Sequence, residues 1–246
     1  MPEAVVEERG FRNDRRLMLV DSTGKFLTQR DLPRMALIRP RLNGCRLFLT
    51  APGMPGFEMD CQTEGETIEV TVWSDTCRAV DQGRAAAEWF SDFLHISCRL
   101  VWFPDDFTRS VDSAFAAAPG DQVAFADGYP FLLISQASLD DLNGRLPAPV
   151  AMKRFRPNII VAGGEPYQED RWRKIRIGSV AFSVVKPCSR CVIPTIDPET
   201  AKKAKEPLKT LSRYRKSADG KILFGQNLIH QSYGSIRVGD RIEVLE

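Results

Sequence analysis

The feature that most constrains the fold of this chain is a repeated alternation of short apolar segments with tight turns. Residues 35–42 and 45–49 flank Asn43-Gly44, a dipeptide that readily supplies the positive φ angles of a two-residue hairpin turn. Residues 16–20 and 25–28 flank a second turn that contains glycine. The first part of the chain is therefore predicted to form consecutive antiparallel hairpins.

Two further segments extend this prediction. In residues 67–73 apolar and polar side chains alternate, which is typical of a half-buried strand. Between Gln82 and Ile96 the apolar residues instead recur at helical spacing, so we expect an amphipathic helix that covers the sheet. Its aromatic stripe indicates core packing rather than a cofactor site. His95, near its end, is expected at a cap or on the surface.

A loose connection follows residue 104, and we place a domain boundary near residue 107. In the second part, Ser138 is predicted to cap a helix over residues 139–146, with Asp141 completing a capping box. Short strands at close spacing favour a barrel-like, mainly antiparallel β domain. These predicted strands cover residues 122–126, 131–135, 158–161, 174–177, 180–185 and 241–245.

Composition narrows the class of protein. With 246 residues and 43% hydrophobic residues, the chain can bury a substantial core. Charged residues, Gly or Pro interrupt its apolar stretches before membrane-spanning length, and the acidic N-terminus lacks the apolar region of an export signal. Six scattered cysteines do not form the pattern of a small disulfide scaffold, so we expect free thiols in a reducing compartment, the cytoplasm.

The formal net charge is only +2, but basic residues concentrate toward the C-terminus. Residues 202–216 contain seven Lys and Arg against a single Glu. Such a segment could bind nucleic acid or another anionic ligand. Because no stacking pattern or recognition-helix motif accompanies it, a solvated surface is the favoured interpretation, and nucleic acid is not expected as a partner.

The chemistry-bearing motif is Cys188-Ser189-Arg190-Cys191. The sequence has no dinucleotide fingerprint, P-loop or nucleophile elbow, and only two His, which gives little support to a hydrolase triad or His-based zinc catalysis. The motif alone could be half of a zinc site, a redox pair or two structural thiols. Zinc would need a second ligand pair, and a thioredoxin-like pair would need a following helix, which Val192-Ile193-Pro194-Thr195 resists.

A fourth interpretation uses more of these residues. Molybdenum binds thiolate sulfur well, and a neighbouring Arg both lowers a thiol pKa and pairs with an anion. Ser189, Arg190 and backbone amides freed at the strand end after residue 185 could hold a phosphate. Arg156, just before a predicted strand, would become a second anion-binding residue beside such a thiolate.

At these residues the chain resembles the MOSC proteins, named for the C-terminal domain of molybdenum cofactor sulfurase, and more closely their amidoxime-reducing, YcbX-type branch. The resemblance is carried by motifs that appear in the family's order along nearly the whole chain. They are Asp14-Arg15-Arg16, Phe26-Leu27-Thr28-Gln29-Arg30, Pro33-Arg34-Met35-Ala36-Leu37-Ile38, Phe125-Ala126-Asp127-Gly128-Tyr129-Pro130, Phe155-Arg156-Pro157-Asn158, Asp170-Arg171-Trp172, Lys186-Pro187-Cys188-Ser189-Arg190-Cys191 and Phe224-Gly225-Gln226-Asn227.

The resemblance implies a mainly β fold with minor α structure, in which residues 1–107 form a MOSC-associated β domain and residues 108–246 a MOSC β-barrel. The molybdenum cofactor, molybdopterin, would lie between them. In the family pattern Cys191 ligates molybdenum, Asp127 lies beside the metal pocket, and Cys188 is supporting. The implied cofactor-binding residues are Arg15, Arg156, Asn158, Ser189 and Arg190.

The implied reaction is reduction of N-hydroxylated compounds, such as hydroxylamines, amidoximes and N-hydroxylated bases. The alternative is a molybdenum-cofactor or sulfur carrier without turnover. Electrons would come from a separate ferredoxin, flavoprotein or cytochrome-type protein, because no iron–sulfur motif follows in this chain. Neither zinc nor a membrane is expected. The family also carries labels of pyridoxal phosphate binding and detoxification, and its usual first strand, with a Lys and a Ser that reach the cofactor, is expected to be missing here.

Overall fold

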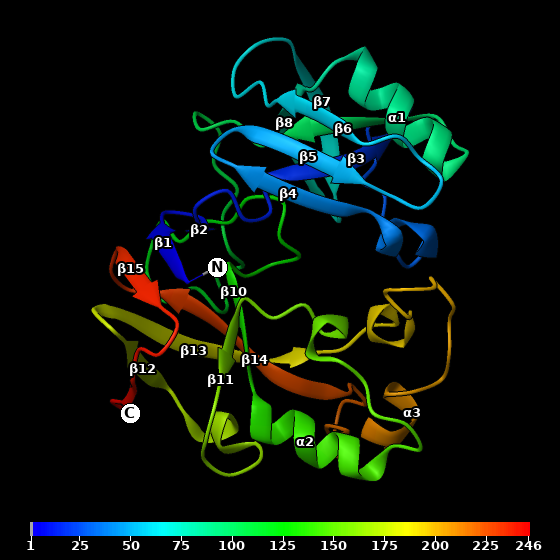
Figure 1. Cartoon of the computed structure of the whole chain (residues 1–246). Coiled ribbons are helices and arrows are strands. Elements are labelled where there is room, and N and C mark those ends of the chain that lie inside the picture. Colours follow the sequence, from blue (N-terminus) through cyan, green and yellow to red (C-terminus); the bar gives the residue numbers. More distant parts are fainter. Residues whose placement is uncertain (1) are drawn as a thin grey trace.

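The computed structural model describes residues 2–246 and has two β-rich units, one above the other in Figure 1. The helices are α1 (Arg84–Leu94), α2 (Gln136–Arg145) and α3 (Leu208–Leu211). The strands are β1 (Glu3–Glu7), β2 (Gly10–Phe11), β3 (Leu17–Asp21), β4 (Arg39–Asn43), β5 (Arg46–Thr50), β6 (Phe57–Asp60), β7 (Thr67–Val72), β8 (Asp75–Asp81), β9 (Cys98–Trp102), β10 (Phe131–Ser135), β11 (Ile159–Val161), β12 (Lys174–Ile177), β13 (Val180–Ser189), β14 (Leu223–His230), β15 (Gly234–Arg237) and β16 (Ile242–Val244).

The first unit consists of two sheets and α1. One sheet has the order β3-β9-β8-β7 and the other β4-β5-β6. The predicted β4–β5 hairpin is confirmed, with Asn43 opposite Arg46 and Gly44 at φ 58°. The strand predicted from residue 35 is wrong at its start, because Pro33–Leu37 forms a 3-10 helix. Proline fixes φ at a helical value and begins such a turn readily.

Helix α1 confirms the helical pattern of the sequence. Trp89, Phe90 and Phe93 are buried and pack against one face of the first sheet together with residues of β5. His95 ends the helix in the left-handed conformation, at φ 58°, and its N–H donates to Ser91 O at 2.8 Å. It is therefore the C-terminal cap, as predicted.

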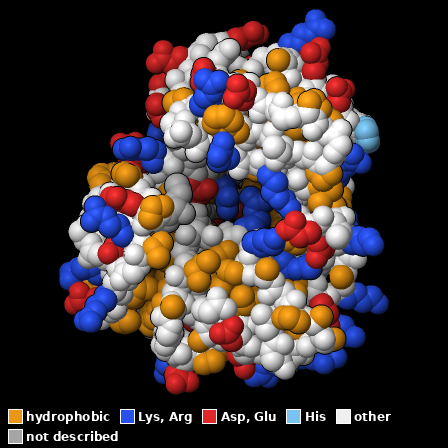
Figure 2. Space-filling model, in the orientation of Figure 1, with side chains coloured by type: hydrophobic (Ala, Val, Ile, Leu, Met, Phe, Trp, Pro, Cys, Tyr) orange, Lys and Arg blue, Asp and Glu red, His pale blue; other side chains and the backbone are white. Residues whose placement is uncertain are grey.

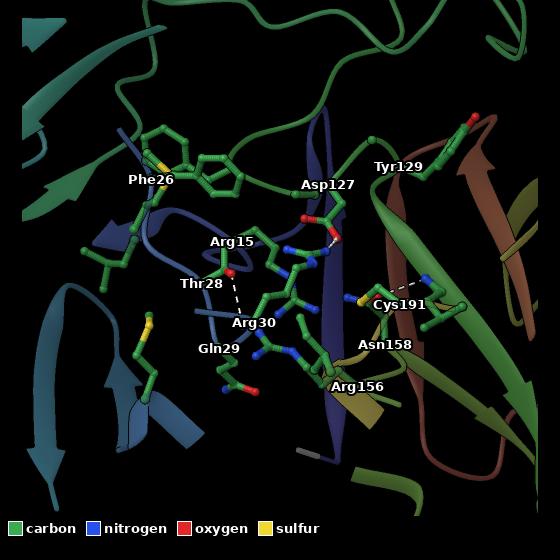
Figure 3. A pocket seen from close by; sticks show the side chains of 18 of the residues that line it. Arg15, Phe26, Thr28, Gln29, Arg30, Asp127, Tyr129, Arg156, Asn158 and Cys191 are labelled. Carbon is green, nitrogen blue, oxygen red and sulfur yellow. Dashed lines mark hydrogen bonds and ion pairs between the residues drawn. The ribbon is translucent and has the colours of Figure 1, made fainter. Parts of the chain in front are cut away.

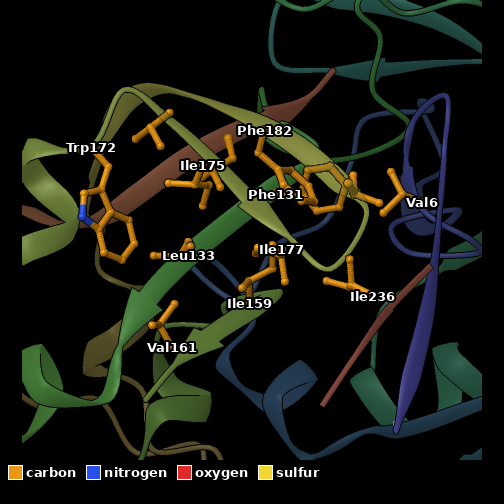
Figure 4. Packing of buried hydrophobic residues seen from close by; sticks show 13 residues of the cluster. Val6, Phe131, Leu133, Ile159, Val161, Trp172, Ile175, Ile177, Phe182 and Ile236 are labelled. Atoms are coloured by element: carbon orange, nitrogen blue, oxygen red, sulfur yellow. The ribbon is translucent and has the colours of Figure 1, made fainter. Parts of the chain in front are cut away.

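The second unit is organised around a six-stranded sheet of order β11-β10-β14-β13-β12-β16. Only the β10–β11 pair is parallel. Its core contains Phe131, Phe182 and Leu228, all essentially fully buried (Figure 4). Strand β1 pairs with β15 in a separate small sheet, and Val6 and Ile236 from these two strands complete the same core. The two ends of the chain therefore stabilise each other.

Two sequence predictions for the second unit are wrong. Residues 122–126 contain only a one-residue bridge, Ser110 with Gln122, because this segment runs between the units rather than along a sheet. Helix α2 starts at Gln136, and Ser135 is the cap, since its Oγ accepts the Ser138 N–H at 3.0 Å. Ser138 is instead a buried residue of the first turn, and its hydroxyl donates to Glu169 at 2.7 Å.

The mainly β fold is nevertheless confirmed, and the boundary near residue 107 stays a prediction. Across residues 2–246, none of the helices combines the length and apolar character that crossing a membrane would require.

Gly225 of β14 provides a test of this packing. Its φ is +83°, and a Cβ there would lie 2.6 Å from Ile134 Cγ1 and 2.8 Å from Leu133 O. We expect Gly225→Ala to destabilise the protein by about 2–4 kcal/mol, from backbone strain plus overpacking. Urea unfolding measures this loss.

Gly220 is the matched control, because its φ is +85° but the nearest atom to an added Cβ, Lys216 Cε, is 3.8 Å away. Gly220→Ala should therefore cost only the backbone term, about 1–2 kcal/mol. Equal losses in the two variants would show that β14 and β10 do not pack as closely as the structure has them.

Candidate functional site

A cavity of about 610 Å³ lies between the two units. In Figure 2 it is the hollow at the centre of the visible face, and several of the side chains at its rim are Lys or Arg. Four segments meet there: the turn before β3, the segment before β10, the segment before β11 and the end of β13. The cavity is lined by all seven residues that the sequence singled out, namely Arg15, Asp127, Arg156, Asn158, Ser189, Arg190 and Cys191.

The thiol motif lies where β13 ends. The strand runs through Lys186 and Pro187 to Ser189, four residues beyond the predicted end, with register irregularities on the way. Arg190 N–H still donates to Ile222 O at 2.8 Å, so the predicted release of backbone amides begins only at Cys191. A single 3-10 turn, Ile193–Thr195, follows rather than an α-helix. The geometry of a thioredoxin-like redox pair is therefore not present.

The two thiols of the motif have different surroundings. Arg190 Nη1 lies 3.1 Å from Cys188 Sγ, and Arg190 Nη2 donates to Phe155 O at 2.8 Å. Burial raises the pKa of Cys188, and Arg190 offsets only part of this rise, so Cys188 is a neutral thiol at neutral pH. Cys191 is free and partly exposed to the cavity. Arg190 therefore supports Cys188, while Cys191 is the thiol available to a ligand.

Arg15 and Arg156 bring two positive charges together inside the cavity (Figure 3). Each has a left-handed backbone, with φ 56° and 57°, which is uncommon for a residue with a side chain and often marks functional sites. The charge of Arg15 and burial lower the pKa of Arg156 to about 10, although Asp127, Asp14 and Cys191 partly oppose this shift. Arg156 is exposed and lines the cavity, so this pair is available to bind an anion there.

Asn158 holds the turn that carries Arg15. Its Nδ2 donates to Asp14 Oδ2 at 2.6 Å, and its Oδ1 accepts the Leu132 N–H at 2.9 Å. Both ends of the amide are thus bonded to protein atoms, and the bond to Asp14 ties the segment before β11 to the turn before β3. The structure places Asn158 at the cavity wall as a residue that positions Arg15, and any contact with a ligand would use its remaining hydrogen-bonding capacity.

Arg30, the last residue of the Phe26-Leu27-Thr28-Gln29-Arg30 motif, is a cavity residue that the sequence does not single out. Its Nη2 lies 3.1 Å from Asp127 Oδ2 and its guanidinium 4.7 Å from the centre of the Trp73 ring. Lys203 Nζ, from the basic C-terminal segment, donates to Arg30 O at 2.9 Å. No local pattern distinguishes Arg30 from other surface arginines, because its role depends on the loop before β4 meeting the second unit.

Among residues 2–246 there is no group of three or more His, Cys, Asp or Glu side chains arranged to hold a metal ion. A metal bound at Cys191 would therefore have to bring its other ligands with it. The donor set of the cavity, one available thiol beside several guanidinium groups, suits an anionic metal complex.

Comparison with known proteins assigns both parts of the chain. The model described as "MOSC domain" matches residues 120–243, and that of the "MOSC N-terminal beta barrel domain" matches residues 1–97. Mitochondrial amidoxime-reducing component 1 of Mus musculus is 35% identical over 260 residues, which cover 96% of this chain and 73% of the relative. The protein of that name from Homo sapiens is 35% identical, with 96% and 74% covered. Molybdenum cofactor sulfurase 1 of Aedes aegypti is also 35% identical, but the match covers 92% of this chain and 31% of that protein.

Arg156 yields a prediction about anion binding. Without a ligand, Arg156→Gln should stabilise the protein slightly, by up to ~1 kcal/mol, since it removes a charge that Arg15 repels across a water-filled cavity. Its depressed pKa means that this penalty is present below pH 10 and fades as Arg156 loses its proton. The stability difference between variant and parent should therefore shrink above about pH 10.

Inorganic phosphate should have the opposite effect on the two proteins. At ten times its dissociation constant, phosphate should stabilise the parent by about 1.4 kcal/mol and so raise its thermal midpoint. The thermal midpoint of Arg156→Gln should rise much less. Arg41→Gln, an exposed guanidinium outside the cavity, is the control. Equal stabilisation of all three proteins would show that the cavity is not the anion site.

Proposed function

The chain belongs to the MOSC-domain family, and on that basis we propose that it is a molybdenum-cofactor-dependent reductase of N-hydroxylated compounds. The observation that carries the proposal is the convergence of one available thiol, Cys191, with Arg15 and Arg156 in a single cavity between the units. The names of the amidoxime-reducing relatives support this choice of substrates.

The residues of the cavity fit the molybdenum cofactor. Cys191 would be the protein's ligand to the metal. Arg15 and Arg156 would pair with the anionic part of the cofactor and so relieve their own repulsion. Ser189, exposed at the end of β13, would offer its hydroxyl as a further donor. Cys188, held by Arg190, would keep the strand end in place.

When bound, the cofactor supplies a centre that can exchange two electrons with the substrate. In the proposed reaction the N–O bond of an amidoxime breaks, two electrons and two protons are consumed, and an amidine and water are formed. The electrons come from a separate protein, of the ferredoxin, flavoprotein or cytochrome type. The protein's part is to orient the substrate and to hold the reacting groups close together in the correct geometry.

We propose that Asp127 orients the substrate. Arg30 binds one of its carboxylate oxygens, Oδ2, at 3.1 Å and thereby fixes the side chain at the cavity wall. The other oxygen can accept a hydrogen bond from the N–H or O–H of an amidoxime. Arg30 in turn is held over the face of Trp73, so it acts through Asp127 as a positioning residue.

A carrier function is the second candidate, because the sulfurase relative shares the same degree of identity. A carrier would bind the cofactor at the same residues but would not reduce any N-hydroxylated compound. Turnover with a chemical reductant therefore distinguishes the two functions.

Cys191→Ser tests the proposed metal ligand. Protein purified from a host that makes the cofactor should contain molybdenum and reduce a hydroxylamine or amidoxime when supplied with reductant. The variant should lose both the metal and more than 99% of the activity, because serine is a poor substitute for thiolate sulfur. Cys45→Ser, which changes an exposed thiol outside the cavity, should keep both. Full metal content in Cys191→Ser would refute the ligand assignment.

Asp127→Asn tests the orienting role. It keeps the size of the side chain but removes the charge that Arg30 binds, so we expect about 10²-fold lower kcat/KM with unchanged molybdenum content. Asp106→Asn, on an exposed carboxylate paired with Arg78 outside the cavity, should have no effect. Unchanged kinetics in Asp127→Asn would leave this carboxylate without a part in the reaction.

A further inference from the structure

The two halves of the cavity differ in chemistry. The second unit contributes charged groups and thiols, namely Asp127, Arg156, Lys186 and the thiol motif, among apolar residues such as Phe131 and Phe155. The first unit, beyond Arg15 and Arg30, contributes mainly hydrocarbon side chains. In Figure 3 the three labelled arginines lie between Cys191 on one side and Phe26, with further apolar side chains, on the other. The apolar residues of this second region include Leu17, Leu19, Met35, Ile38, Leu47 and Leu49.

This apolar chamber follows from how the first unit is built. One core cluster contains residues from both sheets of this unit: Leu19 of β3, and Leu47 and Leu49 of β5. Within residues 2–246 no strand ladder joins these sheets, so their facing apolar surfaces meet through side-chain packing. The cavity reaches into the space between them, where these three leucines form a closed floor and are at most 6% exposed.

The entrance to the chamber is apolar yet incompletely buried. Leu17, Met35 and Ile38 pack against this core, but each keeps part of its surface open, and each also lines the cavity. Met35 lies on the 3-10 turn Pro33–Leu37, and Ile38 follows it directly. Apolar surface that faces water inside a concave site is covered favourably by hydrocarbon and unfavourably by a charged group.

We propose that this chamber binds the hydrocarbon body of the substrate, so that the enzyme prefers N-hydroxylated amidines with an alkyl or aryl group over small, wholly polar N-hydroxylated compounds. The N–O group would then lie in the charged half of the cavity, beside Cys191. The inference rests on the proposed reductase function for its substrate head group, but the chamber itself is a property of the first unit.

A homologous series of substrates tests the preference. With the intact, cofactor-loaded protein, kcat/KM for acetamidoxime, butanamidoxime and hexanamidoxime should rise about fourfold for each methylene, which corresponds to ~0.8 kcal/mol per buried CH₂. Equal values across the series, with clear turnover, would overturn the chamber proposal while leaving the reductase function intact.

Met35→Gln tests the location of the hydrocarbon site. The substitution keeps the side-chain length but makes one wall of the entrance polar, so kcat/KM for hexanamidoxime should fall about fivefold while that for acetamidoxime stays unchanged. Met54→Gln is the matched control, because Met54 packs on the same core but does not line the cavity. Equal effects of the two substitutions would overturn the proposal.

A binding measurement separates the chamber from the reaction. Calorimetry with hexanamidine and acetamidine, the corresponding products, needs no turnover. Hexanamidine should bind at least tenfold more tightly, with a negative heat-capacity change, and Met35→Gln should reduce this advantage. Such binding without reduction of any amidoxime would refute the reductase function and keep the chamber. Equal binding of the two amidines would refute the chamber, whatever the activity.

Discussion

Repulsion between Arg15 and Arg156 is the interaction on which the arrangement of the site depends. The two guanidinium groups lie close enough for Arg15 to lower the pKa of Arg156, and both residues adopt a left-handed backbone. Such a pair persists only where the surrounding structure holds it. The Asn158–Asp14 hydrogen bond provides this restraint, since it ties the turn of Arg15 to the strand region that carries Arg156. An anionic ligand would relieve the repulsion and stabilise the folded protein.

The site exists because two units with different cores meet. The second unit is held by its six-stranded sheet and by the β1–β15 pair, which places the thiol motif at the end of a long strand. The first unit has two sheets that no strand ladder joins within residues 2–246, and apolar surface between them stays open to the cavity. Arg30 and Asp127 join the units at the boundary between charged and apolar walls. One cavity can therefore hold both a charged group and a hydrocarbon group.

Local sequence patterns predicted those elements in which the spacing of apolar residues matches the buried face of the strand or helix. The β4–β5 hairpin, β7 and α1 were all predictable, since turn glycine and apolar periodicity follow directly from burial on one face. Strand β14 was missed, although it is central, because Gly225-Gln226-Asn227 interrupts its apolar pattern. Residues 122–126 gave the opposite error, because they are buried between the units without pairing in a sheet. An apolar segment can therefore be predicted to be buried without showing whether it pairs in a sheet or packs between two units.

The sequence by itself determined the composition of the site: a Cys-x-x-Cys motif after a strand, two arginine motifs and an aspartate, in an order typical of one family. Such motifs are defined by residue type and spacing, so the sequence alone is enough to identify them. Only the tertiary structure decided that Arg190 supports Cys188, that Asn158 positions Arg15, and that Arg30 pairs with Asp127 across 97 positions of sequence. It also decided that buried core residues of β3 and β5 form part of the cavity wall. Contacts between distant segments depend on how sheets pack, and no local pattern encodes that packing.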